Sequence, residues 1–165
     1  MMKKGLKFGI MTYPLTHSNK MEVHLKRLDQ DFHFEAMGSS PVPVHIDAAE
    51  GIGGHNAGAR PMELLLMGLG GCTAIDVILI LKKQRQLIDD FQIRLSGTRE
   101  KIEGTEKSPF RSINIQFELK GQIDGKKALK AIQMSMEKYC SATAQLEPSS
   151  LITHTLILND TPFIA

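Results

Sequence analysis

LLLMGLGGCTAIDVILIL, residues 64–81, is an almost wholly apolar run that contains one cysteine and one aspartate. A membrane-spanning helix needs about 20 apolar residues, so the run is at the lower limit of that length. Asp76, near its middle, would cost about 2.5 kcal/mol or more at the centre of a bilayer. Stretches of alternating apolar and polar residues precede and follow the run, as in soluble folds. We therefore expect a helix of a soluble protein and no membrane insertion.

The run is apolar on every side of a helix, which is typical of helices that are buried all round. A single chain of 165 residues can hardly surround such a helix completely. The run therefore predicts a homodimer in which a second subunit covers part of the helix. We expect this helix to extend from about Pro61 to Arg85, with the proline in its first turn and basic residues in its last turn, where they oppose the helix dipole.

The segments on either side of this helix show the periodicity of strands. Residues 20–47 alternate with a period of two and are interrupted twice, which predicts a three-stranded meander. The chain after the helix predicts two strands at residues 91–96 and 112–121, an amphipathic helix at residues 125–140 and a last strand at residues 150–158. The order βββ-α-ββ-α-β predicts an α+β fold with mostly antiparallel sheets around a buried central helix.

Length and composition fit one compact domain. The net charge of +2 and the absence of a dense basic run give no indication of nucleic-acid binding. Two cysteines without a CxxC pair exclude a disulfide-rich secreted scaffold and a four-cysteine zinc site. Residues 1–19 begin basic but lack the apolar core of a signal peptide. We expect residues 1–19 to form an N-terminal arm, residues 20–165 a single domain, and the protein to be cytoplasmic.

Two further patterns are weak indications of a binding site. The glycine-rich segment GIGGHNAGARP, residues 51–61, lacks the Lys-Ser/Thr ending of a phosphate-binding loop, and Asn56 stands where a dinucleotide fingerprint needs a glycine. His24, His33 and His45 fall on the polar face of the meander, without the ligand spacing of a zinc site. We interpret the segment as a flexible connection to the helix, and the histidines as part of a solvated sheet face.

The two cysteines are the candidate reactive residues. Cys72 lies in the apolar run, and Cys140 lies on the apolar stripe of the second predicted helix. Free cysteine packs as a small hydrophobic residue, so both residues can equally be part of the core. Gly68, Gly70 and Gly71 precede Cys72 and leave room either for a substrate or for the close packing of a dimer mate.

A second residue on the same helix bears on the reactivity of Cys72. Asp76 is four residues later and therefore shares its face. An unpaired carboxylate there would disfavour the thiolate, so a reactive Cys72 needs a cation nearby. Arg27, Arg60 or a residue of the partner subunit could supply that cation.

The residues around the two cysteines resemble a known family. ARPMELLLMGLGGCTAIDVILILKK, residues 59–83, followed by KYCSATAQLEPSSLITHTLIL, residues 138–158, resembles the OsmC/Ohr family, and most closely its YhfA-like branch. That family comprises osmotically inducible protein C and the organic hydroperoxide resistance proteins, and the resemblance covers roughly residues 20–158. It implies an α+β fold, an intertwined homodimer and a thiol-dependent peroxidase that acts on organic hydroperoxides in the oxidative stress response.

The resemblance also implies roles for the two cysteines. Cys72 matches the peroxidatic position and would become a sulfenic acid, and Cys140 matches the resolving position and would form a disulfide with it. A dithiol reductant, typically lipoyl-type in the family, would restore both thiols, and no metal or organic cofactor is required. An apolar lining would favour organic hydroperoxides over hydrogen peroxide. The alternative is a non-catalytic relative that serves as a redox sensor or binds an apolar ligand.

One position departs from the family pattern. Family members with peroxidase activity carry a glutamate ten residues before the first cysteine, and it helps to position a catalytic arginine. Met62 stands there in this chain, and Glu63 follows it. A helix turns about 100° per residue, so Glu63, nine residues before Cys72, is expected on the opposite side of the helix.

Overall fold

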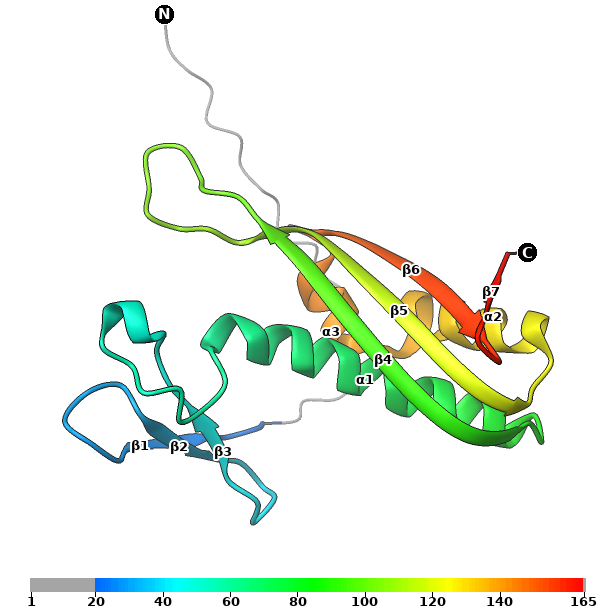
Figure 1. Ribbon diagram of the computed structural model, residues 1–165, viewed down its shortest axis with the longest axis horizontal. Coiled ribbons are helices and arrows are strands. Elements are labelled where there is room, and N and C mark those ends of the chain that lie inside the picture. Colours follow the sequence, from blue (N-terminus) through cyan, green and yellow to red (C-terminus); the bar gives the residue numbers. More distant parts are fainter. Residues whose placement is uncertain (1–19, 165) are drawn as a thin grey trace, which may run out of the picture. The chain divides into compact units, whose positions relative to one another are not determined.

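Figure 1 shows the fold of the chain in a computed structural model that describes residues 20–164. The chain divides into two compact units, the first ending at Gly58 and the second beginning at Ala59. The N-terminal arm expected over residues 1–19 lies outside the described residues.

The first unit contains the predicted three-stranded meander. Strands β1 (His24–Arg27), β2 (Phe34–Met37) and β3 (Val44–Ile46) pair antiparallel in the order β1-β2-β3. Leu25 pairs with Ala36, and Phe34 pairs with Ile46, so the alternating apolar residues share one face as expected. A short 3-10 helix, η1 (Glu50–Ile52), follows the meander.

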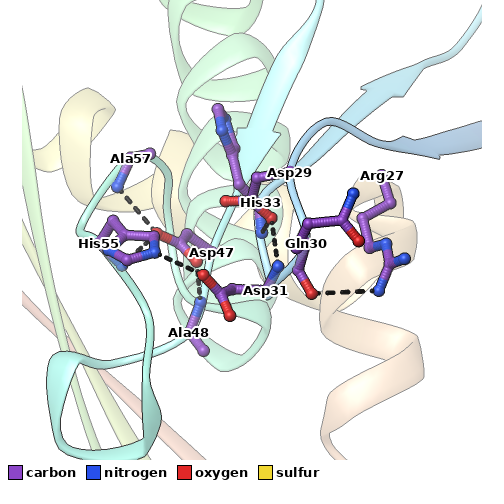
Figure 2. A network of polar contacts seen from close by, with 9 residues as sticks. All are labelled: Arg27, Asp29, Gln30, Asp31, His33, Asp47, Ala48, His55 and Ala57. Atoms are coloured by element: carbon purple, nitrogen blue, oxygen red, sulfur yellow. Dashed lines mark hydrogen bonds and ion pairs between the residues drawn. The ribbon is translucent and has the colours of Figure 1, made fainter.

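A buried carboxylate shapes the glycine-rich segment that leaves this unit. Asp47 is only 1% exposed and accepts hydrogen bonds from the backbone N–H groups of Ala48, His55 and Ala57, at 2.7, 2.8 and 3.0 Å. Figure 2 shows the carboxylate in the middle of this network. These bonds hold the pKa of Asp47 below its ordinary value, and the bond from Ala57 has the largest effect. The segment is therefore a loop folded around Asp47, which agrees with a structural rather than a phosphate-binding role.

The second unit is a four-stranded sheet with helices packed against it. Strands β4 (Leu87–Arg99), β5 (Phe110–Gln122), β6 (Leu151–Leu158) and β7 (Thr161–Phe163) lie in the order β4-β5-β6-β7. The helices are α1 (Pro61–Lys83), α2 (Gly125–Met134) and α3 (Ser141–Leu146), with a π-helix, η2 (Ser135–Tyr139), between the last two. The β5–β6 pair is parallel and the other pairs are antiparallel. The predicted α+β class is confirmed.

Local signals explain where α1 begins and ends. Pro61 is its first residue, and the Glu63 carboxylate accepts the backbone N–H of Arg60 at 2.8 Å, which satisfies one of the free donors at the helix start. Lys82 and Lys83 lie in the last turn. Arg85 has a φ of 57°, in the left-handed region, so the helix stops just before it.

One face of α1 is the centre of the core, and another is open. Leu69, Val77 and Leu81 are fully buried and pack with β5 residues such as Phe117 (Figure 1 shows α1 along the sheet). On the open face Ile75 is 61% exposed, and Leu65 and Leu79 are about half exposed. The described chain therefore does not surround the helix by itself, as its composition predicted. By length and composition alone α1 could cross a membrane, but its packing is that of a core helix and gives no indication of a membrane.

The region after β5 corrects one prediction. A continuous helix over residues 125–140 is wrong, because α2 ends at Met134 and the chain continues as the π-helix η2. Cys140 follows η2 in an extended conformation and precedes α3, so it does not lie on a helical stripe. The short elements α3 and β7 were not expected from periodicity. β7 follows Asn159 and Asp160, both with positive φ, as a tight hairpin turn requires.

Candidate functional site

Three side chains that can take part in thiol chemistry meet in the second unit. The sulfurs of Cys72 and Cys140 and a carboxylate oxygen of Asp76 all lie within 4.8 Å of one another. Cys72 and Asp76 are one turn apart on α1, whereas Cys140 comes from a segment 68 residues later. The structure therefore brings together the two cysteines that the sequence analysis selected.

The π-helix η2 delivers Cys140 to this position. The backbone N–H of Cys140 donates to the carbonyl of Ser135 at 2.8 Å, five residues back, as in a π-helical turn. The wider turn replaces the regular spacing of α2 from Ser135 on and ends at Tyr139, one residue before Cys140. π-Helical turns occur often at functional sites. Both η2 and α3 contact α1, which places the Cys140 side chain against that helix.

Cys140 is the more enclosed of the two thiols. It is 4% exposed, and its sulfur accepts the backbone N–H of Thr143 at 3.3 Å. Burial is the largest effect on its pKa and raises it above the ordinary value. The neighbouring Cys72 thiol raises the pKa further, whereas the Thr143 hydroxyl and N–H act in the opposite direction. Burial therefore disfavours the thiolate form of Cys140.

Cys72 is half-buried, and the space beside it is open. Apart from its chain neighbours and the backbone of α1, a methyl group added to Gly68 or Gly71 would meet no atom within 4 Å. Gly70 is different, because a methyl group there would come within 2.7 Å of Leu95 Cδ1. One of the glycines before Cys72 thus allows close packing on the sheet, and the other two lie on the open face of α1.

A buried hydroxyl holds Asp76. Ser135 is fully buried, and its Oγ donates to Asp76 Oδ2 at 2.9 Å. Within residues 20–164, no basic side chain lies within 4.0 Å of the Asp76 carboxylate. Sequence reasoning did not find Ser135 or Thr143, because neither residue carries a motif and only the π-helix and α3 bring them to the site.

The two arginines considered as activating cations have different positions. Arg60 stands at the start of α1, twelve residues before Cys72 and thus about 18 Å away along the helix axis, beyond the reach of its side chain. Arg27 belongs to the first unit, where its Nη1 donates to the Gln30 carbonyl at 3.4 Å. A role for Arg27 beside Cys72 stays a prediction.

Met62, which stands where the family pattern has a glutamate, and the following Glu63 have structural roles. The Glu63 carboxylate is engaged at the first turn of α1, on the helix side opposite Cys72 as expected. Met62 packs against the core of the second unit. Neither side chain takes part in the cluster of Cys72, Asp76 and Cys140.

A cavity of about 350 Å³ adjoins the cluster. Its lining is mostly apolar, and Asp76 forms part of its wall. The lining residues are Asp76, Leu79, Ile80, Lys83, Gln84, Met134 and Tyr139. The cavity therefore offers apolar surface to an alkyl or aryl group on the side of Asp76.

The three histidines of the meander do not form a common site. His33 Nε2 and His45 Nδ1 are 2.9 Å apart, and the paired register places His24 elsewhere on the same face. Among the described residues, the groups with metal-ligating spacing do not include any of these histidines. The interpretation of a solvated sheet face is retained.

Comparison with known proteins gives a consistent result. Residues 54–155 match the sequence model of a family described as OsmC-like protein. Protein YhfA of Escherichia coli strain K12 is 40% identical over 98 residues, which are 58% of this chain and 69% of YhfA. A hypothetical protein from Aquifex aeolicus VF5 has a similar structure, with a TM-score of 0.70, 30% identity and coverage of 86% of this chain and 99% of that one.

More distant structures share the fold alone. The organic hydroperoxide resistance protein OhrB of Bacillus subtilis has a TM-score of 0.61 and 15% identity, covering 84% of this chain and 98% of its own. An OsmC-like protein from Mycoplasma pneumoniae has a TM-score of 0.72 and 18% identity, covering 86% of this chain and 99% of its own.

Proposed function

The chain belongs to the OsmC-like protein family, and on that basis we propose that it is a thiol-dependent peroxidase that reduces organic hydroperoxides with Cys72 and Cys140. The observation that carries this proposal is the approach of the two sulfurs to within 4.8 Å. The more accessible thiol, Cys72, is assigned the attack on the peroxide. The enclosed thiol, Cys140, is assigned the second step.

The proposed cycle uses two electrons from the thiol pair. The Cys72 thiolate attacks the terminal peroxide oxygen, the O–O bond breaks, and the alkoxide leaves as the alcohol after it takes up a proton. The Cys140 thiol then attacks the sulfur of the Cys72 sulfenic acid, an S–S bond forms and water leaves. A dithiol reductant, of lipoyl type in our proposal, reduces this disulfide and is itself oxidised to a disulfide.

The geometry is compatible with disulfide formation after a small movement. A disulfide bond needs an S–S distance of about 2.05 Å, so the sulfurs must approach by up to about 2.7 Å. Cys140 precedes the six-residue helix α3 and follows a π-helical turn, both of which are short elements. In the proposal, a change of side-chain rotamer together with a shift of this segment closes the distance.

Apolar surface beside the cluster supports an organic substrate. The cavity of about 350 Å³ is lined by residues such as Leu79, Ile80 and Met134. Transfer of an alkyl or aryl group from water to such a surface is favourable by about 25 cal/mol per Å² buried, a gain that hydrogen peroxide does not have. We therefore expect cumene hydroperoxide to react faster than hydrogen peroxide.

The open face of α1 supports a homodimer. Leu65, Ile75 and Leu79 expose about half of their surface or more on one side of a helix that is apolar throughout. Contiguous apolar surface of this kind on a soluble protein marks an interaction site. In the proposal a second copy of the chain covers this face, residues 20–165 act as one OsmC-like domain in each subunit, and the protein works in the cytoplasm under oxidative stress.

No basic side chain of residues 20–164 lies within 4.0 Å of the Asp76 carboxylate, although Lys83 lines the same cavity, and this favours a second candidate function. A cation from Arg27 or from the second subunit would complete a peroxidase site, whereas without one Cys72 would oxidise slowly. The chain would then serve as a redox sensor or as a binder of an apolar ligand, without turnover.

A turnover assay separates the two functions. The reduced full chain is mixed with one equivalent of cumene hydroperoxide and then with dihydrolipoamide in excess. Repeated consumption of peroxide supports the enzyme, and a single stoichiometric oxidation supports the sensor. Cys72→Ser should abolish both reactions, whereas Cys140→Ser should retain the first oxidation but stop at the sulfenic acid. Size-exclusion chromatography with light scattering tests the dimer separately, and a stable monomer would contradict the proposed role of the open face.

A further inference from the structure

The cluster of Cys72, Cys140 and Asp76 combines two soft ligands with one hard ligand, and in its reduced form it has the composition of a metal site. We propose that the reduced protein binds one thiophilic divalent cation, of which Zn²⁺ is the type, through Cys72 Sγ, Cys140 Sγ and a carboxylate oxygen of Asp76. The fourth position of the ion is left to water. This proposal needs only the reduced thiols and does not depend on peroxidase activity.

The distances fit a tetrahedral ion. Zinc binds sulfur at about 2.3 Å and carboxylate oxygen at about 2.0–2.2 Å, so two ligand atoms on one ion are about 3.5–3.8 Å apart. The three ligand atoms lie within 4.8 Å of one another before any adjustment. The distances between the ligand atoms therefore need to shorten by about 1 Å for all three atoms to bind one ion. This movement is smaller than the one that a disulfide requires.

The charges of the cluster also favour a cation. Two thiols and a carboxylate meet where no basic side chain of residues 20–164 lies within 4.0 Å of the carboxylate. A divalent cation would bind all three groups as anions, and the two thiol protons would be released on binding.

The groups around the cluster orient two of the three ligands, Asp76 and Cys140. The fully buried Ser135 donates its hydroxyl proton to Asp76 Oδ2 and leaves Oδ1 available, while the N–H of Thr143 donates to Cys140 Sγ. The Thr143 hydroxyl is buried and has no hydrogen-bond partner among the described residues.

Within one chain the cluster is open on the side of Cys72. This residue is half-buried, and added methyl groups at Gly68 and Gly71 would meet no atom of another segment within 4 Å. This side belongs to the open face of α1 with Leu65 and Ile75, so in the proposed dimer the second subunit faces the bound ion. Bound zinc would keep both thiols as ligands, so metal binding and disulfide formation exclude each other at this site.

The test titrates the reduced, full-length chain with Cd²⁺ and Zn²⁺ in the absence of peroxide and oxygen. Cd²⁺ is followed by the ultraviolet charge-transfer band of cadmium thiolates, and the Zn²⁺ affinity is measured by competition with a chromophoric chelator. We expect one equivalent of Cd²⁺ per chain to saturate the band. Cys72→Ser and Cys140→Ser should each reduce its intensity to about half and weaken Zn²⁺ binding.

The carboxylate is tested with Asp76→Asn, which still accepts the hydrogen bond of Ser135 but loses the anionic ligand. We expect its Zn²⁺ affinity to fall at least about tenfold. Asp89→Asn, at an exposed position on β4, is the matched control and should bind as the unchanged chain does. His55→Ala controls for the exposed group of Asp29, Asp31 and His55 and should leave the thiolate band unchanged.

Two results would overturn the proposal. One is Cd²⁺ or Zn²⁺ binding that does not change when either cysteine is replaced, which would locate the metal on surface groups. The other is an Asp76→Asn chain that is folded by circular dichroism and binds Zn²⁺ as tightly as the unchanged chain. If Asp76→Asn does not fold, two Cd²⁺ measurements decide whether the thiols bind the ion. The charge-transfer band of the unchanged chain should saturate at one equivalent of Cd²⁺, and Cys140→Ser should lose about half of its intensity. Peroxide turnover takes no part in these readouts, so failure of the proposed enzyme and failure of the metal site are distinguishable.

Discussion

Replacement of Ser135 by alanine tests how the site is held together. The Ser135 hydroxyl is fully buried and donates to Asp76 Oδ2 at 2.9 Å, which links the π-helix to α1. A hydrogen bond to a charged group contributes about 1.5–3 kcal/mol, and the half-buried carboxylate can regain part of this from water. We therefore expect Ser135→Ala to lower the free energy of unfolding by about 1–2 kcal/mol and the melting temperature by about 3–6 °C.

The assay is urea denaturation followed by circular dichroism at pH 7 with both thiols reduced. Ser149→Ala is the matched control, because its exposed hydroxyl donates only to the Leu146 carbonyl at 3.3 Å, and its effect should stay within about 0.5 kcal/mol. In an Asp76→Ala background, Ser135→Ala should cost almost nothing, since the partner is already absent. Equal losses from Ser135→Ala in both backgrounds would refute the proposed link between the two segments.

Two other predictions concern packing and pH. Gly70→Ala places a methyl group 2.7 Å from Leu95 Cδ1, whereas the methyl group of Gly71→Ala meets no atom of another segment within 4 Å. In urea denaturation the first variant should therefore be less stable than the second by about 1–3 kcal/mol. Equal stabilities would contradict the close packing of α1 on the sheet. The folded pKa of Asp47 is lowered, so its contribution to stability is fully present above about pH 3.9 and is lost as the pH falls through the folded value. Amide exchange at His55 and Ala57 should therefore accelerate below that pH, and Asp47→Asn should show faster exchange already at neutral pH; unchanged exchange in the variant would exclude this role of the carboxylate.

Much of the fold follows from local patterns in the sequence. The alternation of apolar and polar residues predicts β4, β5 and β6, the long apolar run predicts α1, and the structure confirms these elements. The short elements were missed because six residues in α3 and three in β7 cannot show a period. The π-helix η2 was missed because its five residues directly prolong α2, and only the bonding pattern, with the Cys140 N–H donating to the Ser135 carbonyl, sets it apart.

The sequence predicts only part of the candidate site. Cys72 and Asp76 share a helix face by spacing alone, whereas the position of Cys140 depends on the turn after α2 and on the packing of α3 against α1. The roles of Ser135 and Thr143 follow from the same packing. In the first unit, the shape of the glycine-rich loop depends on Asp47, which precedes the loop in sequence.

The measurement that tests the central claim most directly is the mass of the reduced chain after one equivalent of cumene hydroperoxide. We expect a loss of two hydrogen atoms and, after proteolysis without reductant, one peptide pair joined through Cys72 and Cys140. Cys140→Ser should instead gain one oxygen at Cys72, and hydrogen peroxide should react more slowly with the unchanged chain. A chain that keeps both thiols free under these conditions, or that forms only disulfides between different chains, would contradict the account.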